Sequence, residues 1–192
     1  QPVDPLRSPV SFFSLLKRRK LLINALLAML FGFGLAASGN FISPFAEFRQ
    51  LQHISLFYLS YSFAAVGIRF IAGRLADRIG ESRILPWGLL LVAVSLLLIP
   101  SIYGTGMLLL TGFIFGCGHG LLFPALNAMA VRDEPYQLRG KVTGIFTGGI
   151  DAGAFCGALL LGLIGDISGY SMLFTCAGLT VAVGLPLLRL AR

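Results

Sequence analysis

Three ionisable side chains lie inside long apolar stretches of the sequence: Asp151, His119 and Arg69. Asp151 is ten residues beyond Lys141, which precedes its apolar stretch, so at about 1.5 Å per helical residue it lies about 15 Å deep in a membrane. Ionisable groups at such depth are costly and usually face a cavity or a partner. Asp151 could therefore bind and release a proton, or form a static pair with Arg69, and the sequence leaves both interpretations open.

For the other polar residues at membrane depth, a structural role is an alternative to a functional one. His119 lies among glycines and could simply hydrogen-bond a neighbouring helix. Arg69 is near the end of its apolar stretch, so its side chain could extend to the membrane surface. Asn127 and Asn40 fit hydrogen bonds between helices better than solute binding. The candidates for proton or solute binding are Asp151, Arg69, His119 and Asn127.

A charged segment, residues 73–83, reads GRLADRIGESR and lies between two apolar stretches. Gly73 and Gly80 permit a tight reversal between antiparallel helices. Asp77 can accept hydrogen bonds from Arg78, from Arg83 or from the amides at the start of a neighbouring helix. The segment could thus form a two-state ionic latch, or it could only set the turn and the orientation of the chain.

Two stripes of glycine repeat every four residues, so each lies along one face of a helix. Such stripes let helix backbones approach closely, and they are expected to be packing surfaces or, alternatively, surfaces that slide or bend. Their members are Gly112, Gly116 and Gly120 in one apolar stretch and Gly149, Gly153 and Gly157 in the next.

The composition is that of an all-α polytopic membrane protein. The chain has 192 residues, of which 56% are hydrophobic and 12% charged, whereas soluble domains average about 25% charged. About 20 apolar residues form a helix that crosses a bilayer. Six stretches meet this requirement: 21–41, 54–73, 84–100, 107–131, 142–165 and 170–188.

The basic residues predict the orientation of these spans. Thirteen Lys and Arg residues lie in the N-terminal arm (1–20), two alternate loops and the tail, whereas the three opposite loops contain only Arg49. Cytoplasmic loops are enriched in basic residues. Both termini and the charged segment are therefore expected in the cytoplasm, with the multi-pass domain (21–192) in the inner membrane.

Two segments of the chain repeat the pattern Gly-x-x-x-Asp-x-x-Gly-x-Ser. They begin at Gly73 and Gly162, and each links the second and third spans of a three-span group. Because three is odd, the two groups face opposite ways. The sequence thus predicts a 3+3 inverted repeat, an arrangement found in the halves of one large transporter fold.

The charged segment resembles the signature loop of the major facilitator superfamily. Gly73, Leu75, Ala76, Asp77, Arg78, Gly80 and Leu85 match its pattern, whereas Glu81 and Ser82 replace a usual basic pair. The stretches "GFIFGCGHGLLFPALNAMAV" and "GGIDAGAFCGALLLG" are similar to the tenth and eleventh helices of bacterial, efflux-type members.

This resemblance extends from Lys17 onward and implies the C-terminal six-helix half of a twelve-helix transporter. It implies alternating access between two domains, with a small-molecule substrate, a proton or another coupling ion, and an N-terminal six-helix half as partners within the lipid bilayer. It also favours the latch over the simple turn for the charged segment.

Other classes of function fit the sequence less well. An intramembrane enzyme would require a nucleophile with a base, or a metal site, and the sequence contains neither H-E-x-x-H nor a G-x-S-x-G elbow. A channel would require rings of like polar groups, and a non-transporting scaffold stays an alternative. No nucleic-acid motif occurs, and no cofactor or metal is expected.

Overall fold

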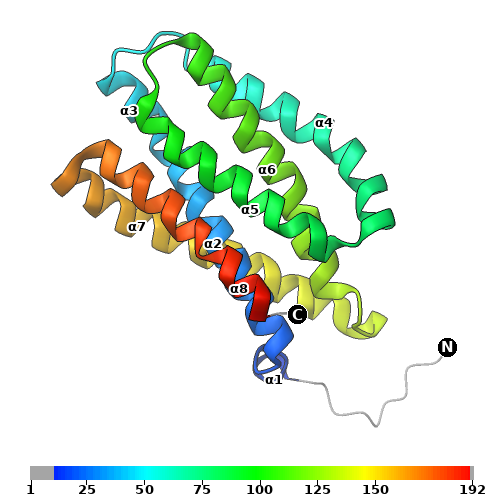
Figure 1. Cartoon of the computed structure of the whole chain (residues 1–192). Helices are drawn as coiled ribbons and strands as arrows, with labels where there is room; N and C mark the ends of the chain where they lie inside the picture. Colours follow the sequence, from blue (N-terminus) through cyan, green and yellow to red (C-terminus); the bar gives the residue numbers. More distant parts are fainter. Residues whose placement is uncertain (1–10, 191–192) are drawn as a thin grey trace.

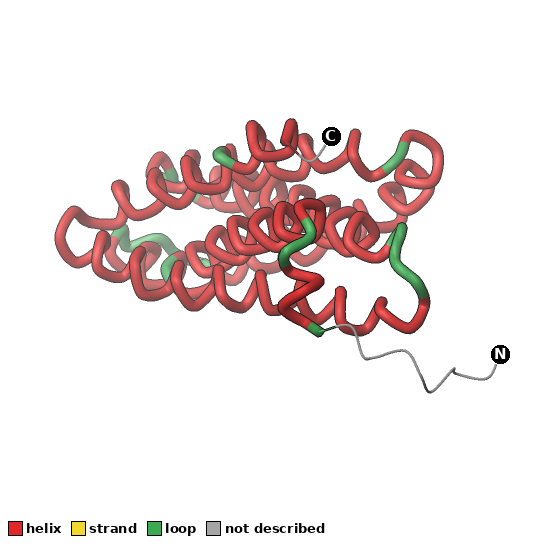
Figure 2. The backbone as a smooth tube through the Cα atoms, turned by 90° about the horizontal axis from the view of Figure 1, so that it is seen from below, coloured by secondary structure: helices red, strands yellow, loops and turns green. Residues whose placement is uncertain are grey.

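The computed structural model describes residues 11–190, with the backbone alone over 71–79 and at Glu81. Within this range the chain is helical, without strands, and its connections are short (Figure 2). The helices are α1 (Phe12–Leu16), α2 (Arg19–Asn40), α3 (Ile42–Phe48), α4 (Ser55–Ile79), α5 (Glu81–Leu98), a 3-10 turn (Ile99–Ser101), α6 (Thr105–Val131), α7 (Tyr136–Ala182) and α8 (Gly184–Leu190).

The long helices form one bundle, in which α2 packs mainly on α7, and α6 on both α4 and α5. Figure 1 shows α1, the end of α8 and the α6–α7 connection at one end of this bundle. We call this the basic end, since Arg18, Lys20, Arg139 and Arg189 lie there. The short helix α3, the α5–α6 connection and a reversal within α7 lie at the opposite end (Figure 1).

Four stretches of the described chain are long and apolar enough to cross a membrane, which agrees with an all-α membrane fold. The last is 55 residues long and includes the reversal within α7. Helix α4 is not among the four, since its side chains are described only over residues 55–70. The four stretches are Arg19–Asn40, Ser82–Ser101, Thr105–Val131 and Tyr136–Leu190.

Two single glycines reverse the chain where the sequence analysis expects loops. Helix α4 continues six residues past Gly73 to Ile79, so Gly80 alone separates it from α5. Gly169 is the non-helical residue within α7. Their φ angles are +83° and +80°, a conformation that glycine adopts without a steric penalty. The expected turn role of Gly73 is therefore wrong, whereas that of Gly80 is confirmed.

The glycine stripes are packing surfaces between specific helices. A β-carbon at Gly112 would lie 2.5 Å from the Phe57 carbonyl oxygen, and one at Gly120 would lie 2.7 Å from that of Ala65, both on α4. On α7, a β-carbon at Gly149 would lie 2.8 Å from the Ala25 carbonyl oxygen of α2. The glycines thus bring α6 against α4 and α7 against α2.

The same holds for the remaining members of the two stripes. A β-carbon at Gly116 would meet the Tyr61 carbonyl oxygen, and one at Gly153 that of Met29. At Gly157 it would lie 2.9 Å from the Ala36 β-carbon. These contacts between backbones explain why the stripes contain no larger residues.

Arg49 has an evident structural role at the end opposite the basic end. Its guanidinium donates a hydrogen bond to the Pro100 carbonyl oxygen at 3.1 Å. The same group lies over the rings of Phe45 and Tyr103, at 5.6 and 5.1 Å from their centres. Cation–π contacts of this kind stabilise a fold modestly, so Arg49 joins α3 to the α5–α6 connection.

Candidate functional site

The close approach of α4 to α6 brings His119 against Tyr61. The Tyr61 hydroxyl lies 2.7 Å from His119 Nδ1, and the imidazole tautomer decides which group donates the hydrogen bond. The Phe31 ring of α2 meets the imidazole edge-on, with ring centres 5.2 Å apart. His119 therefore hydrogen-bonds a neighbouring helix, and it does so where three helices meet.

Arg69 adds a positive charge farther along α4. It follows Tyr61 by eight residues, about 12 Å along the helix. The Arg69 side chain is exposed in this chain. Tyr61 and His119 are in direct contact, and we refer to them together with Arg69 as the polar group of α4 and α6.

A cavity adjoins this polar group on the side away from the basic end. It has a volume of about 120 Å³. Tyr61 and Phe115 separate it from His119, and their rings lie 5.8 Å apart. The residues that line it come from α2, α4 and α6: Leu35, Ser38, Gly39, Phe57, Tyr58, Tyr61 and Phe115.

Two asparagines lie in or near the contact between α2 and α6, Asn24 on α2 and Asn127 on α6. Asn24 is buried, and its Nδ2 donates a hydrogen bond to the Leu126 carbonyl oxygen at 2.8 Å. Asn127 Oδ1 is buried and has no hydrogen-bond partner among the described residues. Asn127 therefore keeps a free acceptor, which the interhelical role expected from sequence does not explain.

Asp151 lies on an exposed face of α7, away from α2. Gly140, Gly144 and Gly148 have no neighbour within 4 Å at the position of a β-carbon, so this part of α7 is open in the described chain. Among the described side chains, Asp151 and Arg69 form no ion pair with each other. The static pair considered from sequence is therefore absent from this chain.

The structure describes the charged segment only in part. The side chains of Asp77 and Arg78, together with the surroundings of Gly73, lie outside the described residues. Arg83 is exposed near the start of α5. The latch is therefore still a prediction.

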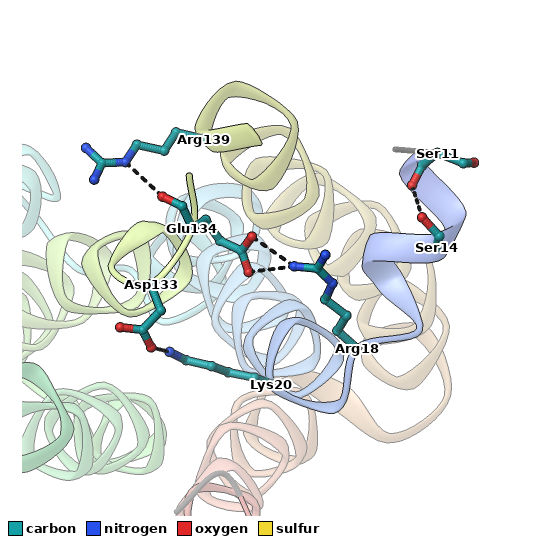
Figure 3. Close-up of polar contacts among 7 residues, drawn as sticks. All are labelled: Ser11, Ser14, Arg18, Lys20, Asp133, Glu134 and Arg139. Atoms are coloured by element: carbon teal, nitrogen blue, oxygen red, sulfur yellow. Dashed lines mark hydrogen bonds and ion pairs between the residues drawn. The ribbon is translucent and has the colours of Figure 1, made fainter. Parts of the chain in front are cut away.

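Two ion pairs at the basic end join α2 to the α6–α7 connection (Figure 3). Arg18 Nη1 donates to both carboxylate oxygens of Glu134, at 3.1 and 3.0 Å. Lys20 Nζ pairs with Asp133 Oδ2. Arg139 Nε donates to the Glu134 carbonyl oxygen at 3.3 Å. The two ion pairs attach the start of α2 to residues that are more than 100 positions away in the sequence.

The sequence did not reveal these ion pairs. Nor did it reveal the hydrogen bonds that Tyr61 and Asn24 form between helices. Tyr61 and Asn24 interrupt apolar stretches, which is the available signal for a polar contact in a membrane helix. The Asp133–Glu134 pair is an acidic dipeptide in a basic loop. Its partners could not be chosen from sequence, because four basic residues stand in a row at 17–20.

The hydrogen bond that Lys20 donates to Asp133 lowers the pKa of this carboxyl below its ordinary value of 3.8, and the positive charge of Lys20 lowers it further. A carboxyl whose pKa falls on folding stabilises the fold above its unfolded pKa, and loses this effect as pH falls through the folded pKa. We therefore expect Asp133→Asn to flatten the decline of the thermal midpoint below pH 4. Because the Asp133 side chain is largely exposed, the effect should be small and should shrink in high salt. An unchanged acid profile in low salt would contradict the pairing.

Comparison with known proteins adds family evidence to this geometry. The model of the Major Facilitator Superfamily matches residues 25–192. The chain belongs to this superfamily. The family consists of transporters, so the chain is a multi-pass membrane protein of the transporter type and not an enzyme.

Individual members of the superfamily are similar over much of this chain. The uncharacterized MFS-type transporter YhhS of Escherichia coli is 30% identical over 186 residues, covering 93% of the chain and 44% of YhhS. A quinolone resistance transporter of Acinetobacter baumannii is 29% identical over 137 residues, covering 71% of the chain and 30% of that protein. The chain thus spans less than half the length of these relatives.

A solved structure shows the same fold at low sequence identity. It is a peptide transporter, POT, in complex with alafosfalin, with a TM-score of 0.65 and 22% identity. The match covers 97% of this chain and 39% of the POT chain. Nearly every described helix therefore has a counterpart in part of that peptide transporter's fold.

Proposed function

We propose that this chain is the C-terminal half of a secondary active transporter, which moves a small solute by alternating access and couples the movement to protons. The family match over residues 25–192 carries the proposal. The relatives are more than twice as long as the matched region, which leaves room for an N-terminal six-helix half. The missing half would supply the other wall of a shared cavity.

The proposed half crosses the inner membrane six times as a 3+3 inverted repeat. The matched glycines Gly80 and Gly169 support this arrangement, because both reverse the chain with nearly the same φ angle. Residues 1–20 would be the cytoplasmic arm between halves, and 21–192 the membrane domain. The ion pairs at the basic end fit a cytoplasmic position for both termini.

The charged segment remains the proposed latch. Asp77, Arg78 and Arg83 would hold the cytoplasmic side closed in one state, and Gly80 would set the hairpin that presents them. Gly73 lies within α4 and would contribute to the helix rather than to the turn.

Proton coupling is proposed for the polar groups at membrane depth. Asp151 lies on the open face of α7, where a carboxylate can alternate between a proton and a partner on the other half. His119 and Tyr61 form a hydrogen bond that can reorganise with the imidazole tautomer. Arg69 would offer a positive charge to the solute, and Asn127 Oδ1, now buried and unpaired, would accept a hydrogen bond only after the helices around it move.

Transport by the full-length protein in proteoliposomes tests this function. The relatives are named for quinolones and, in one 35% identical plant protein, for anions, so norfloxacin and inorganic phosphate are suitable first solutes. We expect one of them to accumulate only when a pH gradient is imposed. Asp151→Asn should lower the initial rate at least about tenfold, as expected when a group that transfers a proton is lost.

Asp166→Asn is the matched control, since Asp166 is an exposed carboxylate on α7, three residues before the reversal at Gly169. It should leave the proton dependence of transport intact. Equal accumulation with and without the pH gradient would favour a channel, and unchanged proton movement in Asp151→Asn would remove Asp151 from the coupling mechanism.

A further inference from the structure

Three side-chain hydroxyls line the cavity between α2, α4 and α6, and each is hydrogen-bonded within the protein. The Ser38 hydroxyl donates to the Leu35 carbonyl oxygen at 3.2 Å. The Tyr58 hydroxyl is hydrogen-bonded to Ser43 at 3.1 Å, and the Tyr61 hydroxyl to His119. The hydrogen-bonding hydroxyls of the lining are thus already paired within the protein.

The rest of the lining is apolar, and none of the lining residues is charged. A charged group placed there would lose its hydration without gaining a partner, which is strongly unfavourable. An aromatic ring, in contrast, could make edge-on or offset contacts with Phe57 and Phe115, as aromatic pairs prefer. The chemistry of the walls therefore selects an uncharged, apolar occupant.

The volume limits the size of this occupant. An apolar cavity of about 150 Å³ in another protein stays dry and binds benzene. The present cavity, at about 120 Å³, is slightly smaller and partly open. A single six-membered ring is therefore close to the largest group that it can hold without rearrangement.

We propose that this cavity is a subsite for a ring-sized, uncharged apolar part of the transported solute. The proposal rests on the proposed transport function and specifies the chemistry of the solute. Tyr61 is shared by the cavity and the hydrogen bond to His119, so the apolar part would bind directly beside the polar group of Tyr61, His119 and Arg69.

Gly39 offers a direct way to fill the cavity. It lines the cavity, and a β-carbon there would meet nothing within 4 Å, so Gly39→Leu can occupy the space without a clash at its base. Gly106 on α6 is equally open and does not line the cavity. Gly106→Leu is therefore the matched control, and Leu35→Phe is a second filling variant.

The experiment measures fluorobenzene binding to the full-length protein in detergent by ¹⁹F NMR line broadening, with protein-free micelles as the blank. We expect saturable broadening for the wild type and Gly106→Leu, and loss of this component in Gly39→Leu and Leu35→Phe. The anionic analogue 4-fluorobenzoate should show no saturable component with any of them.

Several outcomes would overturn the proposal. These are fluorobenzene binding that persists in both filling variants, a wild type indistinguishable from empty micelles, and equal binding of 4-fluorobenzoate. Circular dichroism melting of each variant confirms that it is folded. Because the measurement is made at equilibrium without a pH gradient, it can fail while proton-driven transport stands, and the reverse also holds.

Discussion

Gly153→Ala is expected to destabilise the protein by about 3 kcal/mol, the upper part of the range for overpacked cores. The added methyl group would run into the Met29 carbonyl oxygen of α2, and a backbone atom cannot move aside as a flexible side chain can. Helices α2 and α7 would have to separate along their main contact. The thermal midpoint of the purified protein measures this loss.

Gly148→Ala provides the matched control on the same helix. A β-carbon at Gly148 meets nothing within 4 Å, and alanine is a better helix former than glycine by about 1 kcal/mol. Its midpoint should therefore stay unchanged or rise. Equal destabilisation by the two substitutions would show that α7 does not pack on α2 through Gly153.

Arg18→Gln is expected to cost about 2 kcal/mol, because hydrogen bonds to charged groups contribute about 1.5–3 kcal/mol. The Glu134 side chain is only 11% exposed, whereas Arg18 is 48% exposed. Removing Arg18 leaves the carboxylate largely buried without its cation, which is more harmful than removing both charges. Equilibrium unfolding in a denaturing detergent measures the change.

The double substitution Arg18→Gln with Glu134→Gln should recover most of the lost stability. Arg19→Gln is the control. Arg19 is the exposed neighbour of Arg18, so this substitution removes the same charge from the arm. If Arg19→Gln were as harmful as Arg18→Gln, the effect would reflect total charge rather than the pair with Glu134.

Hydropathy predicted the all-helical membrane fold, whereas the count of six spans stays a prediction, since four stretches of the described residues are long and apolar enough to cross a membrane. The apolar stretch 21–41 corresponds closely to α2 (Arg19–Asn40). Helix α4 continues past the apolar limit at Gly73 because a helix does not end where the hydrocarbon does. Hydropathy reports the thickness of the membrane, whereas backbone hydrogen bonds and Gly80 decide where the helix stops.

The glycine stripes and the reversals illustrate what pattern alone can and cannot determine. Their spacing predicted close packing but not the partner helices, since α4 and α2 are chosen by the whole bundle. The repeat pointed to matched positions, and the structure adds that Gly80 and Gly169 share a backbone conformation. The one-residue reversal at Gly80 was not expected, because the charged residues on both sides of it are typical of a loop.

The candidate site was only partly accessible from sequence for a different reason. His119 was identified by its depth, but the distance to Tyr61 depends on how α6 is rotated and shifted against α4. The sequence placed Asp151 deep in the membrane. Its exposure on the open face of α7 could not be predicted, because it depends on which side of that helix packs against α2. Such contacts between distant residues are set by tertiary packing.

The labelling of two matched serines tests the inverted arrangement most directly. Ser82 and Ser171 occupy equivalent positions in the repeated segments. Each is replaced by cysteine in a full-length protein without other cysteines, and intact cells are treated with a membrane-impermeant maleimide. We expect Ser171→Cys to react in intact cells and Ser82→Cys to react only after permeabilisation. Reaction of both from the same side of the membrane would contradict the six-span inverted repeat.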